Sequence, residues 1–338
     1  MLCKYPITTK STGHEVPIPC GQCLPCRINE RRVKTHRMML ESSLTPRNSF
    51  LTLTYRDEDL PDEFVDKKTG ELYARNSVNP SHIKAFTNNL QTSYKRDTGY
   101  NLRYFLCGEY GDKTNRPHYH LALFGYPNCL LPNRNFVVGR KFVPCVCPNC
   151  IYLAKKWPYG HIFLGNLEQQ SAQYVAGYVT KKMHTNTCGC KGEYHHEKCA
   201  HSKLQGRYPE FSRQSLKPGL GHDAIVKHAI SKKSYIHKVD DIPKFLIHDQ
   251  KKWPIGKYLF NVYKETLGFE NEPVTKAHQA RERHDTVLAM FKDKTLSGYQ
   301  KDLIYKGLPE SALRLLNAQR VLQIEKREEF KVLNKQGV

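Results

Sequence analysis

Residues 118–124, with the sequence HYHLALF, constrain the fold more than any other part of this chain. The run is rich in apolar and aromatic side chains, which is typical of a β-strand. A second run of this kind, LRYFLCGE at residues 102–109, precedes it, and the polar residues 110–116 between the two predict a turn. We therefore predict an antiparallel hairpin, which disfavours a doubly wound parallel sheet.

Further strands and helices are predicted on both sides of the hairpin. FLTLTY at residues 50–55 and the short run 161–164 are typical of strands. Helical patterns cover the basic segment 20–44, a segment that begins at Asn79-Pro80, and residues 168–183. Helices interleaved with strands around an antiparallel hairpin favour an α+β fold, with a central antiparallel sheet and flanking helices.

The character of the chain changes after residues 219–221. Residues 227–257 are rich in lysine and histidine, and residues 273–338 are polar and mostly helical in pattern. A length of 338 residues is enough for about two domains at ~150 residues each. We predict one domain over residues 1–220 and a basic, mainly helical C-terminal region over residues 221–338.

A large positive charge narrows the choice of partner. Lys and Arg number 53 against 32 Asp and Glu, giving a net charge of +21, which favours a polyanion such as nucleic acid. No run approaches the ~18 consecutive apolar residues that cross a bilayer, and residues 1–10 lack the pattern of a secretory signal. We therefore expect no membrane partner and a reducing compartment, in which the cysteines are free thiols or metal ligands.

His118 and His120 are candidate metal ligands because alternate residues of a strand point to one face. The predicted hairpin brings Glu109 opposite His118, so two imidazoles and one carboxylate would share that face. Three protein ligands leave coordination positions open for a substrate. A cross-strand Glu–His link on a solvated face is the alternative. The same ligand set also occurs in non-haem iron oxygenases.

Residues 174–182, with the sequence YVAGYVTKK, supply candidate nucleophiles. On a helix, Tyr174, Tyr178 and Lys181 cluster on the side opposite the apolar stripe. A phenol has a pKa of ~10, so an active tyrosine needs a nearby cation, which Lys181 and a bound ion could supply. Tyrosines that pack against another element or stack on bases are the alternative.

Three stretches taken in order resemble the motifs of the His-hydrophobe-His (HUH) rolling-circle replication initiators. They are FLTLTY at 50–55, GEYG with RPHYHLALFG within 108–125, and YVAGYVTKK at 174–182. The paired tyrosines, together with PCGQCLPCR at 19–27, are similar to initiators of the small single-stranded-DNA bacteriophages, the microviruses, and particularly their gokushovirus branch.

The resemblance implies the HUH endonuclease fold, with Mg²⁺ or Mn²⁺ held by Glu109, His118 and His120, and with Tyr174 and Tyr178 as nucleophiles. It implies metal-dependent nicking of one DNA strand, a 5′-phosphotyrosine with a free 3′-OH, and later rejoining that releases circular single strands. Related motifs often carry a lysine where this chain has Gly177, and Lys181 or Lys182 is expected to take its place.

The implied partners are single-stranded and origin DNA, together with the host helicase and replication machinery. The helicase is expected because the chain lacks the phosphate-binding loop of a motor. The implied location is the host bacterial cytoplasm. A non-catalytic, zinc-containing DNA-binding protein is the alternative function.

The cysteines form a separate pattern. Two closely spaced groups have the spacing of structural Zn²⁺ sites: Cys20, Cys23 and Cys26, and Cys145, Cys147 and Cys150. The segment 188–201 offers further cysteines and histidines. Spacing alone does not tell which four ligands meet, and buried free cysteines are the alternative.

Overall fold

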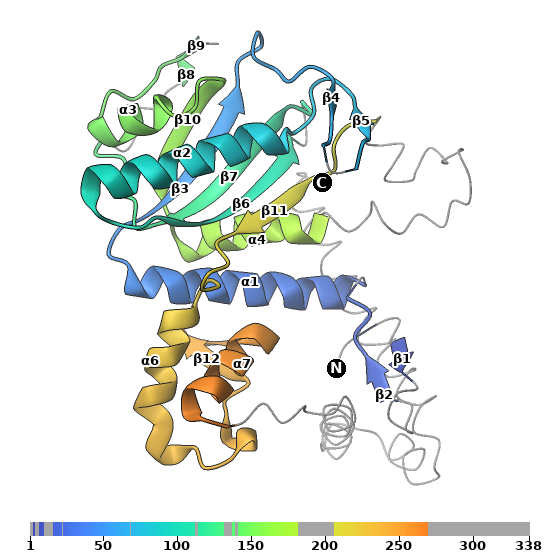
Figure 1. Ribbon diagram of the computed structural model, residues 1–338, viewed down its shortest axis with the longest axis vertical. Coiled ribbons are helices and arrows are strands. Elements are labelled where there is room, and N and C mark those ends of the chain that lie inside the picture. The colour runs from blue at the N-terminus through green and yellow to red at the C-terminus, as the bar shows by residue number, and fades with distance from the viewer. Residues whose placement is uncertain are drawn as a thin grey trace. The chain divides into compact units, whose positions relative to one another are not determined.

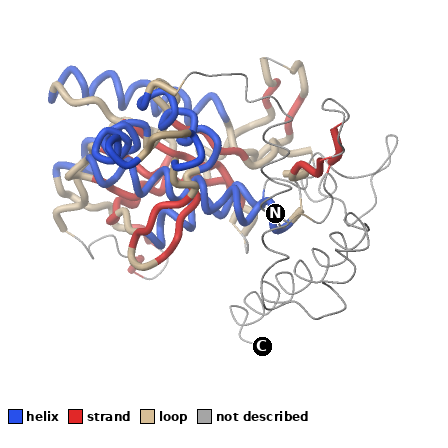
Figure 2. The backbone as a smooth tube through the Cα atoms, turned by 90° about the horizontal axis from the view of Figure 1, so that it is seen from below, coloured by secondary structure: helices blue, strands red, loops and turns tan. Residues whose placement is uncertain are grey.

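The computed structural model describes most of the chain up to residue 269, and the other residues are the grey trace in Figures 1 and 2. The described residues are 3, 7–9, 16–21, 23–67, 69–111, 114–131, 137–138, 141–181 and 206–269. The chain divides into two compact units, Arg31–Leu267 and, separately, Met1–Glu30 with Gly268–Val338. The division predicted between residues 220 and 221 stays a prediction.

The centre of the larger unit is an antiparallel sheet, in which the described residues form five strands in the order β10-β3-β7-β6-β11. The strands are β3 (Asn48–Tyr55), β6 (Arg103–Tyr110), β7 (Pro117–Phe124), β10 (Gly160–Asn166) and β11 (Phe211–Gln214). Together with its flanking helices, this sheet confirms the predicted α+β class. The predicted hairpin is also confirmed, as β6 and β7, with Glu109 directly opposite His118.

One face of the sheet is covered by α2 (Pro80–Thr98), which crosses it in Figure 1. The helix begins as predicted, because the Asn79 side chain accepts hydrogen bonds from the N–H groups of Ser81 and His82. The apolar side of α2 packs on strand residues such as Leu53 and Leu121 in one buried cluster. The short helix α3 (Pro148–Ala154) contributes to the same cluster.

The opposite face is covered by α4 (Gln169–Lys181) and α1 (Leu24–Leu44). Ala172, Val175 and Ala176 of α4 are buried there in one cluster with Met38 of α1 and Phe105 of β6. This is the apolar stripe that the helical pattern predicts. The remaining stripe positions, Val179 and Met183, have side chains outside the described residues.

The larger unit continues past the sheet with a helical segment and a small hairpin. Its elements are α6 (His222–Lys232), the 3₁₀ turns Lys233–Tyr235 and Val239–Asp241, β12 (Phe245–His248), β13 (Lys251–Pro254) and α7 (Gly256–Leu267). Gly256 has a φ of +69°, and a Cβ there would lie 2.6 Å from Val33 of α1. Only glycine therefore lets α7 begin against α1.

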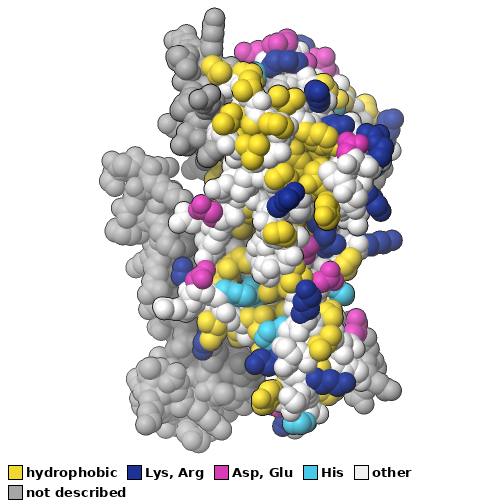
Figure 3. Space-filling model, turned by 90° about the vertical axis from the view of Figure 1, so that its left-hand side faces the viewer, with side chains coloured by type: hydrophobic (Ala, Val, Ile, Leu, Met, Phe, Trp, Pro, Cys, Tyr) yellow, Lys and Arg dark blue, Asp and Glu magenta, His cyan; other side chains and the backbone are white. Residues whose placement is uncertain are grey.

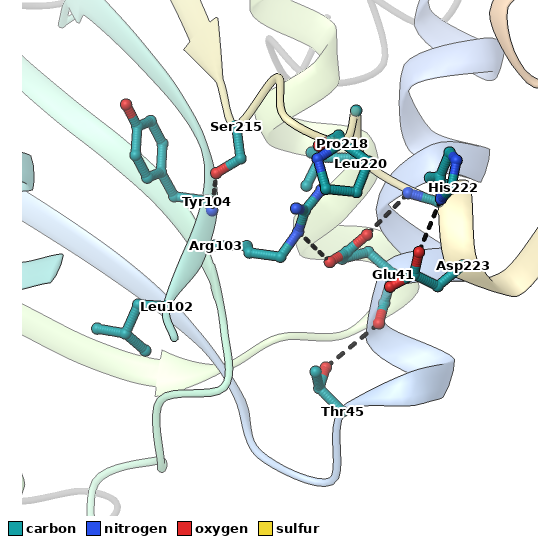
Figure 4. A network of polar contacts seen from close by, with 12 residues as sticks. Glu41, Thr45, Leu102, Arg103, Tyr104, Ser215, Pro218, Leu220, His222 and Asp223 are labelled. Carbon is teal, nitrogen blue, oxygen red and sulfur yellow. Dashed lines mark hydrogen bonds and ion pairs between the residues drawn. The ribbon is translucent and has the colours of Figure 1, made fainter. Parts of the chain in front are cut away.

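A charged network fixes the start of this segment (Figure 4). A carboxylate oxygen of Glu41 on α1 lies 2.5 Å from the Arg103 Nε of β6, and the other oxygen accepts from the Gly221 backbone N–H at 2.8 Å. Arg103 also donates to the Pro218 carbonyl at 2.7 Å. The two charged side chains are mostly buried, so one carboxylate joins α1, the sheet and the chain entering α6.

Three two-stranded pairs complete the described elements. They are β1 (Ile7–Thr9) with β2 (Val16–Ile18), β4 (Phe64–Val65) with β5 (Leu72–Tyr73), and β8 (Val137–Val138) with β9 (Lys141–Phe142). None of the described helices combines the length and the apolar character needed to cross a lipid bilayer. The predicted Cys/His-rich loop at 188–201 and most of the predicted C-terminal helical stretch, 273–338, lie outside the described residues.

Candidate metal and nucleophile site

Three predicted ligands converge on the α4 side of the sheet. The His118 Nε2 lies 2.6 Å from the Glu109 Oε1, and the His120 Nε2 lies 3.0 Å from the same oxygen. One ligand atom from each residue falls within 4.8 Å of the others. The strand alternation of β7 and the pairing of β6 with β7 therefore produce the arrangement that the sequence predicts.

Hydrogen bonds on the far side of each imidazole orient the rings. The His118 Nδ1 donates to the Arg116 carbonyl at 3.0 Å, and since a carbonyl only accepts, this nitrogen carries a proton. The His120 Nδ1 lies 2.9 Å from the Thr52 Oγ1 of β3. Both rings thus direct Nε2 toward Glu109, which is how imidazoles are held when Nε2 ligates a metal.

The electrostatics of the group suit a divalent cation. Burial would raise the pKa of Glu109, but hydrogen bonds from His118 and His120 outweigh it, so the pKa is lowered. Burial would lower the pKa of His118, yet the hydrogen bond to Glu109 raises it overall. The second carboxylate oxygen, Oε2, is buried without a hydrogen-bond partner among the described residues. A buried anionic oxygen beside two imidazole nitrogens fits Mg²⁺ or Mn²⁺.

The predicted nucleophiles lie on α4, next to these ligands. Tyr174 is half exposed, and its ring centroid lies 5.2 Å from that of His120. Tyr178 and Lys181 follow on the same helix, and their side chains lie outside the described residues. The structure therefore brings Tyr174 to the ligand group and places Tyr178 one helical turn further along the backbone.

Two neighbours on β3 were not predicted as part of the site. The Phe50 ring lies 5.4 Å from the His120 ring and 6.4 Å from the Tyr174 ring. Thr52 holds His120 as described above. The alternation in FLTLTY is a signal that could have identified both residues, because residues 50, 52 and 54 point to one face of a strand.

The cysteines form two groups, each with a fourth member that spacing did not reveal. One consists of Cys3, Cys20, Cys23 and Cys26, and we call it the Cys3 cluster. The other consists of Cys129, Cys145, Cys147 and Cys150, and we call it the Cys129 cluster. Cys3 and Cys129 are distant in sequence from their partners, so no local motif marks them.

Comparison with known proteins relates this architecture to the replication proteins of small phages. Residues 48–183 match the family of replication-associated proteins whose model is named for ORF2. This match covers the sheet strands β3, β6, β7 and β10 and the helix α4, so it includes every predicted ligand and tyrosine. The resemblance to phage replication initiators is thereby confirmed.

Individual relatives come from three phages. The chain is 32% identical over 166 residues to the replication-associated protein VP4 of Bdellovibrio phage phiMH2K, covering 49% of this chain and 48% of the relative. It is 29% identical over 242 residues to the replication-associated protein ORF2 of Spiroplasma virus 4, covering 71% and 66%. It is 27% identical over 166 residues to the replication-associated protein ORF4 of Chlamydia phage 1, covering 49% and 38%.

The matched part thus spans about half of the first relative and less than two thirds of the others. No solved structure matches this chain significantly.

Proposed function

We propose that this chain initiates rolling-circle replication of a phage genome by nicking and rejoining one DNA strand through tyrosine. The relatives are named as replication-associated proteins of phages, which supports a role in DNA replication. The observation that carries the finer proposal is the position of Tyr174 beside the ligand group, with ring centroids 5.2 Å apart between Tyr174 and His120. A phenol and a divalent-cation site side by side are the two parts that such a transesterification requires.

Glu109, His118 and His120 would hold the cation, Mg²⁺ or Mn²⁺. The ion supplies positive charge that polarises a phosphate oxygen of the DNA. Thr52 and the Arg116 carbonyl keep the imidazoles in place, so the ligands need little rearrangement when a phosphate arrives.

Tyr174 supplies the nucleophile in this mechanism. Its phenolate oxygen attacks phosphorus, the P–O3′ bond breaks, and the leaving 3′ oxygen takes up a proton to become a free 3′-OH. The products are a 5′-phosphotyrosine and a primer end. Tyr178, one turn along α4, would cleave the regenerated site, and the freed 3′-OH would then attack the first linkage and close a circle. Lys181 would stabilise a phenolate from the same helix.

The substrate is single-stranded and origin DNA, with phosphates neutralised by basic side chains. The net charge of +21 supports this assignment, and Lys and Arg side chains are spread over the face in Figure 3. The protein would act in the host bacterial cytoplasm, where the host helicase and replication machinery extend the primer end.

The experiment incubates the protein with labelled single-stranded oligonucleotides that tile the genome encoding it, in Mn²⁺ or Mg²⁺. We expect a covalent adduct on a denaturing gel from the parent and from each of Tyr174→Phe and Tyr178→Phe. The double variant should form none, because Phe keeps the ring and removes only the nucleophilic oxygen. Tyr100→Phe is the control, since Tyr100 is an exposed tyrosine outside α4.

Mass spectrometry of the adduct then locates the linked residue. A nucleotide attached to a tyrosine outside α4 would contradict the assignment. Tight DNA binding with no adduct under any metal would instead support the non-catalytic, zinc-containing DNA-binding protein.

A further inference from the structure

The Cys129 cluster gathers four thiols from two parts of the chain. Cys129 follows β7, whereas Cys145, Cys147 and Cys150 lead into α3. The Cys129 Sγ lies 3.5 Å from the Cys145 Sγ and 3.7 Å from the Cys147 Sγ. These distances exceed the ~2.05 Å of a disulfide, so the four groups are thiols in mutual contact.

The spacing of these sulfurs is that of a tetrahedral metal site. Four thiolates at the Zn–S distance of ~2.3 Å lie about 3.8 Å from one another. The sulfur separations at Cys129 are close to that value, and all four Sγ atoms fall within 4.8 Å. A small contraction around an ion would complete the geometry.

Backbone N–H groups already point at the sulfurs. Leu131 donates to the Cys129 Sγ at 3.4 Å, Cys147 to the Cys145 Sγ at 3.5 Å, and Cys150 to the Cys147 Sγ at 3.4 Å. Hydrogen bonds of this kind stabilise thiolate ligands and hold them in place before the metal binds.

The Cys3 cluster repeats these features in the smaller unit. The Cys23 Sγ lies 3.8 Å from the Cys3 Sγ and 3.4 Å from the Cys26 Sγ. The Cys20 N–H points at the Cys3 Sγ, and the Cys23 N–H at the Cys20 Sγ, both at 3.3 Å. Two sites of the same design therefore arise from unrelated stretches of sequence.

We propose that each cluster holds one structural Zn²⁺ through its four cysteines. A closed set of four soft thiolates selects Zn²⁺ over Mg²⁺ or Mn²⁺, and it leaves no position for a substrate. The role is structural, because Cys145, Cys147 and Cys150 are buried in the core cluster on the α2 face. The ligand group of Glu109, His118 and His120 belongs to the opposite face, so the two kinds of metal site are independent.

The Cys129 site would close a loop. Cys129 and Cys145 bracket the segment that contains β8 and β9, and an ion joins the two ends beside Tyr126 and Leu153 of the core. Closing such a loop lowers the entropy of the unfolded chain, so metal binding contributes to folding.

The first test measures zinc per chain in full-length protein purified without chelator, in the background of His118→Ala with His120→Ala. This background prevents zinc bound at the ligand group from being counted. We expect Cys129→Ser and Cys3→Ser each to lose one equivalent, and the double variant to lose two. Cys107→Ala is the matched control, a buried cysteine outside both clusters, and it should lose none.

A second measurement needs no cysteine variant and covers the case in which those variants fail to fold. The native parent protein is treated with a thiol-alkylating reagent before and after a strong chelator, and the labelled cysteines are mapped by mass spectrometry. All eight cluster cysteines should be protected until the chelator is added. Refilling with Co²⁺ should then give the visible absorption of a tetrahedral tetrathiolate.

Other outcomes overturn the proposal. Iron in place of zinc would indicate an iron–sulfur or rubredoxin-like centre, and zinc-free protein whose cluster thiols react at once would show free cysteines. Loss of zinc from the Cys107→Ala control, equal to that from Cys129→Ser, would also contradict it. None of these readouts depends on nicking activity, so the proposed function stands or falls separately.

Discussion

On the α2 face of the central sheet the strands bury Leu53, Leu121 and Tyr119, whereas on the α4 face the same strands present Thr52, His118, His120 and Glu109. The contrast is sharpest within HYH. The hydroxyl of Tyr119 donates to the Asn79 carbonyl at 3.0 Å and accepts from its N–H at 2.7 Å, which ties β7 to the start of α2. One side of the sheet supplies stability and the other supplies chemistry, so substitutions at adjacent residues should separate the two.

The largest effect is expected from His120→Ala, on the polar face. Losing a ligand removes several kcal/mol of charge stabilisation in the transition state, so the nicking rate should fall by about 10³-fold. Many Lys and Arg contacts hold the DNA, and binding measured by fluorescence anisotropy should stay near that of the parent. An equal loss of binding and nicking would contradict the role of His120.

Leu121→Ala, the next residue in β7, should do the reverse. Leu121 is fully buried on the apolar face, so truncation should lower the free energy of unfolding by about 2–5 kcal/mol in urea denaturation. Nicking per folded molecule, assayed at low temperature, should change little. If this variant were stable but inactive, the separation of the two faces would be wrong.

A smaller effect is expected from Glu109→Gln. The amide keeps the shape of the side chain but removes the negative charge, so the Mn²⁺ concentration that gives half-maximal nicking should rise by about 10–100-fold. Nicking at saturating Mn²⁺ should partly recover. An unchanged metal titration would exclude Glu109 from the ligand set.

The smallest effect concerns His36, a buried histidine of α1 that faces no carboxylate among the described residues. Burial lowers its pKa to about 4, although a hydrogen bond from Nδ1 to the Pro254 carbonyl and the nearby His248 also act on it. The unfolded chain takes up this proton near pH 6.5, and the folded chain does not until about pH 4. Stability is therefore full above about pH 6.5 and falls as the pH drops toward about 4, by up to about 1.4 kcal/mol per unit.

His36→Phe removes the titrating group, so its unfolding free energy should depend less on pH than that of the parent between about pH 6.5 and 4. The variant also loses the hydrogen bond to Pro254 at every pH, so the difference in slope is diagnostic rather than the offset. Urea denaturation at several pH values checks this. Parallel curves would show that His36 is not the group responsible.

The polar face was predictable from sequence to a degree that the cysteine clusters were not. Strand alternation and a short turn are local, so they place Glu109, His118 and His120 together once the hairpin is recognised. The start of α2 at Asn79 and the buried stripe of α4 follow from local rules in the same way. Each depends on residues that are close in the chain.

The features that sequence reasoning missed depend on distant contacts. Cys3 and Cys129 join their clusters only after the chain has folded back, and β11 pairs with β6 from about a hundred residues away without a strong strand pattern. The roles of Tyr178 and Lys181 stay predictions, because their side chains lie outside the described residues.

Glu41 and Arg103 have a consequence for how such chains diverge. Each is mostly buried, and losing either charge would leave the other without its partner, which is strongly destabilising. An intermediate with one changed residue is therefore the least fit step, so the two positions should be inherited together or replaced together. Related sequences should show covariation between them, and the Gly221 N–H that shares the same carboxylate needs no matching change, because every residue except proline offers that group.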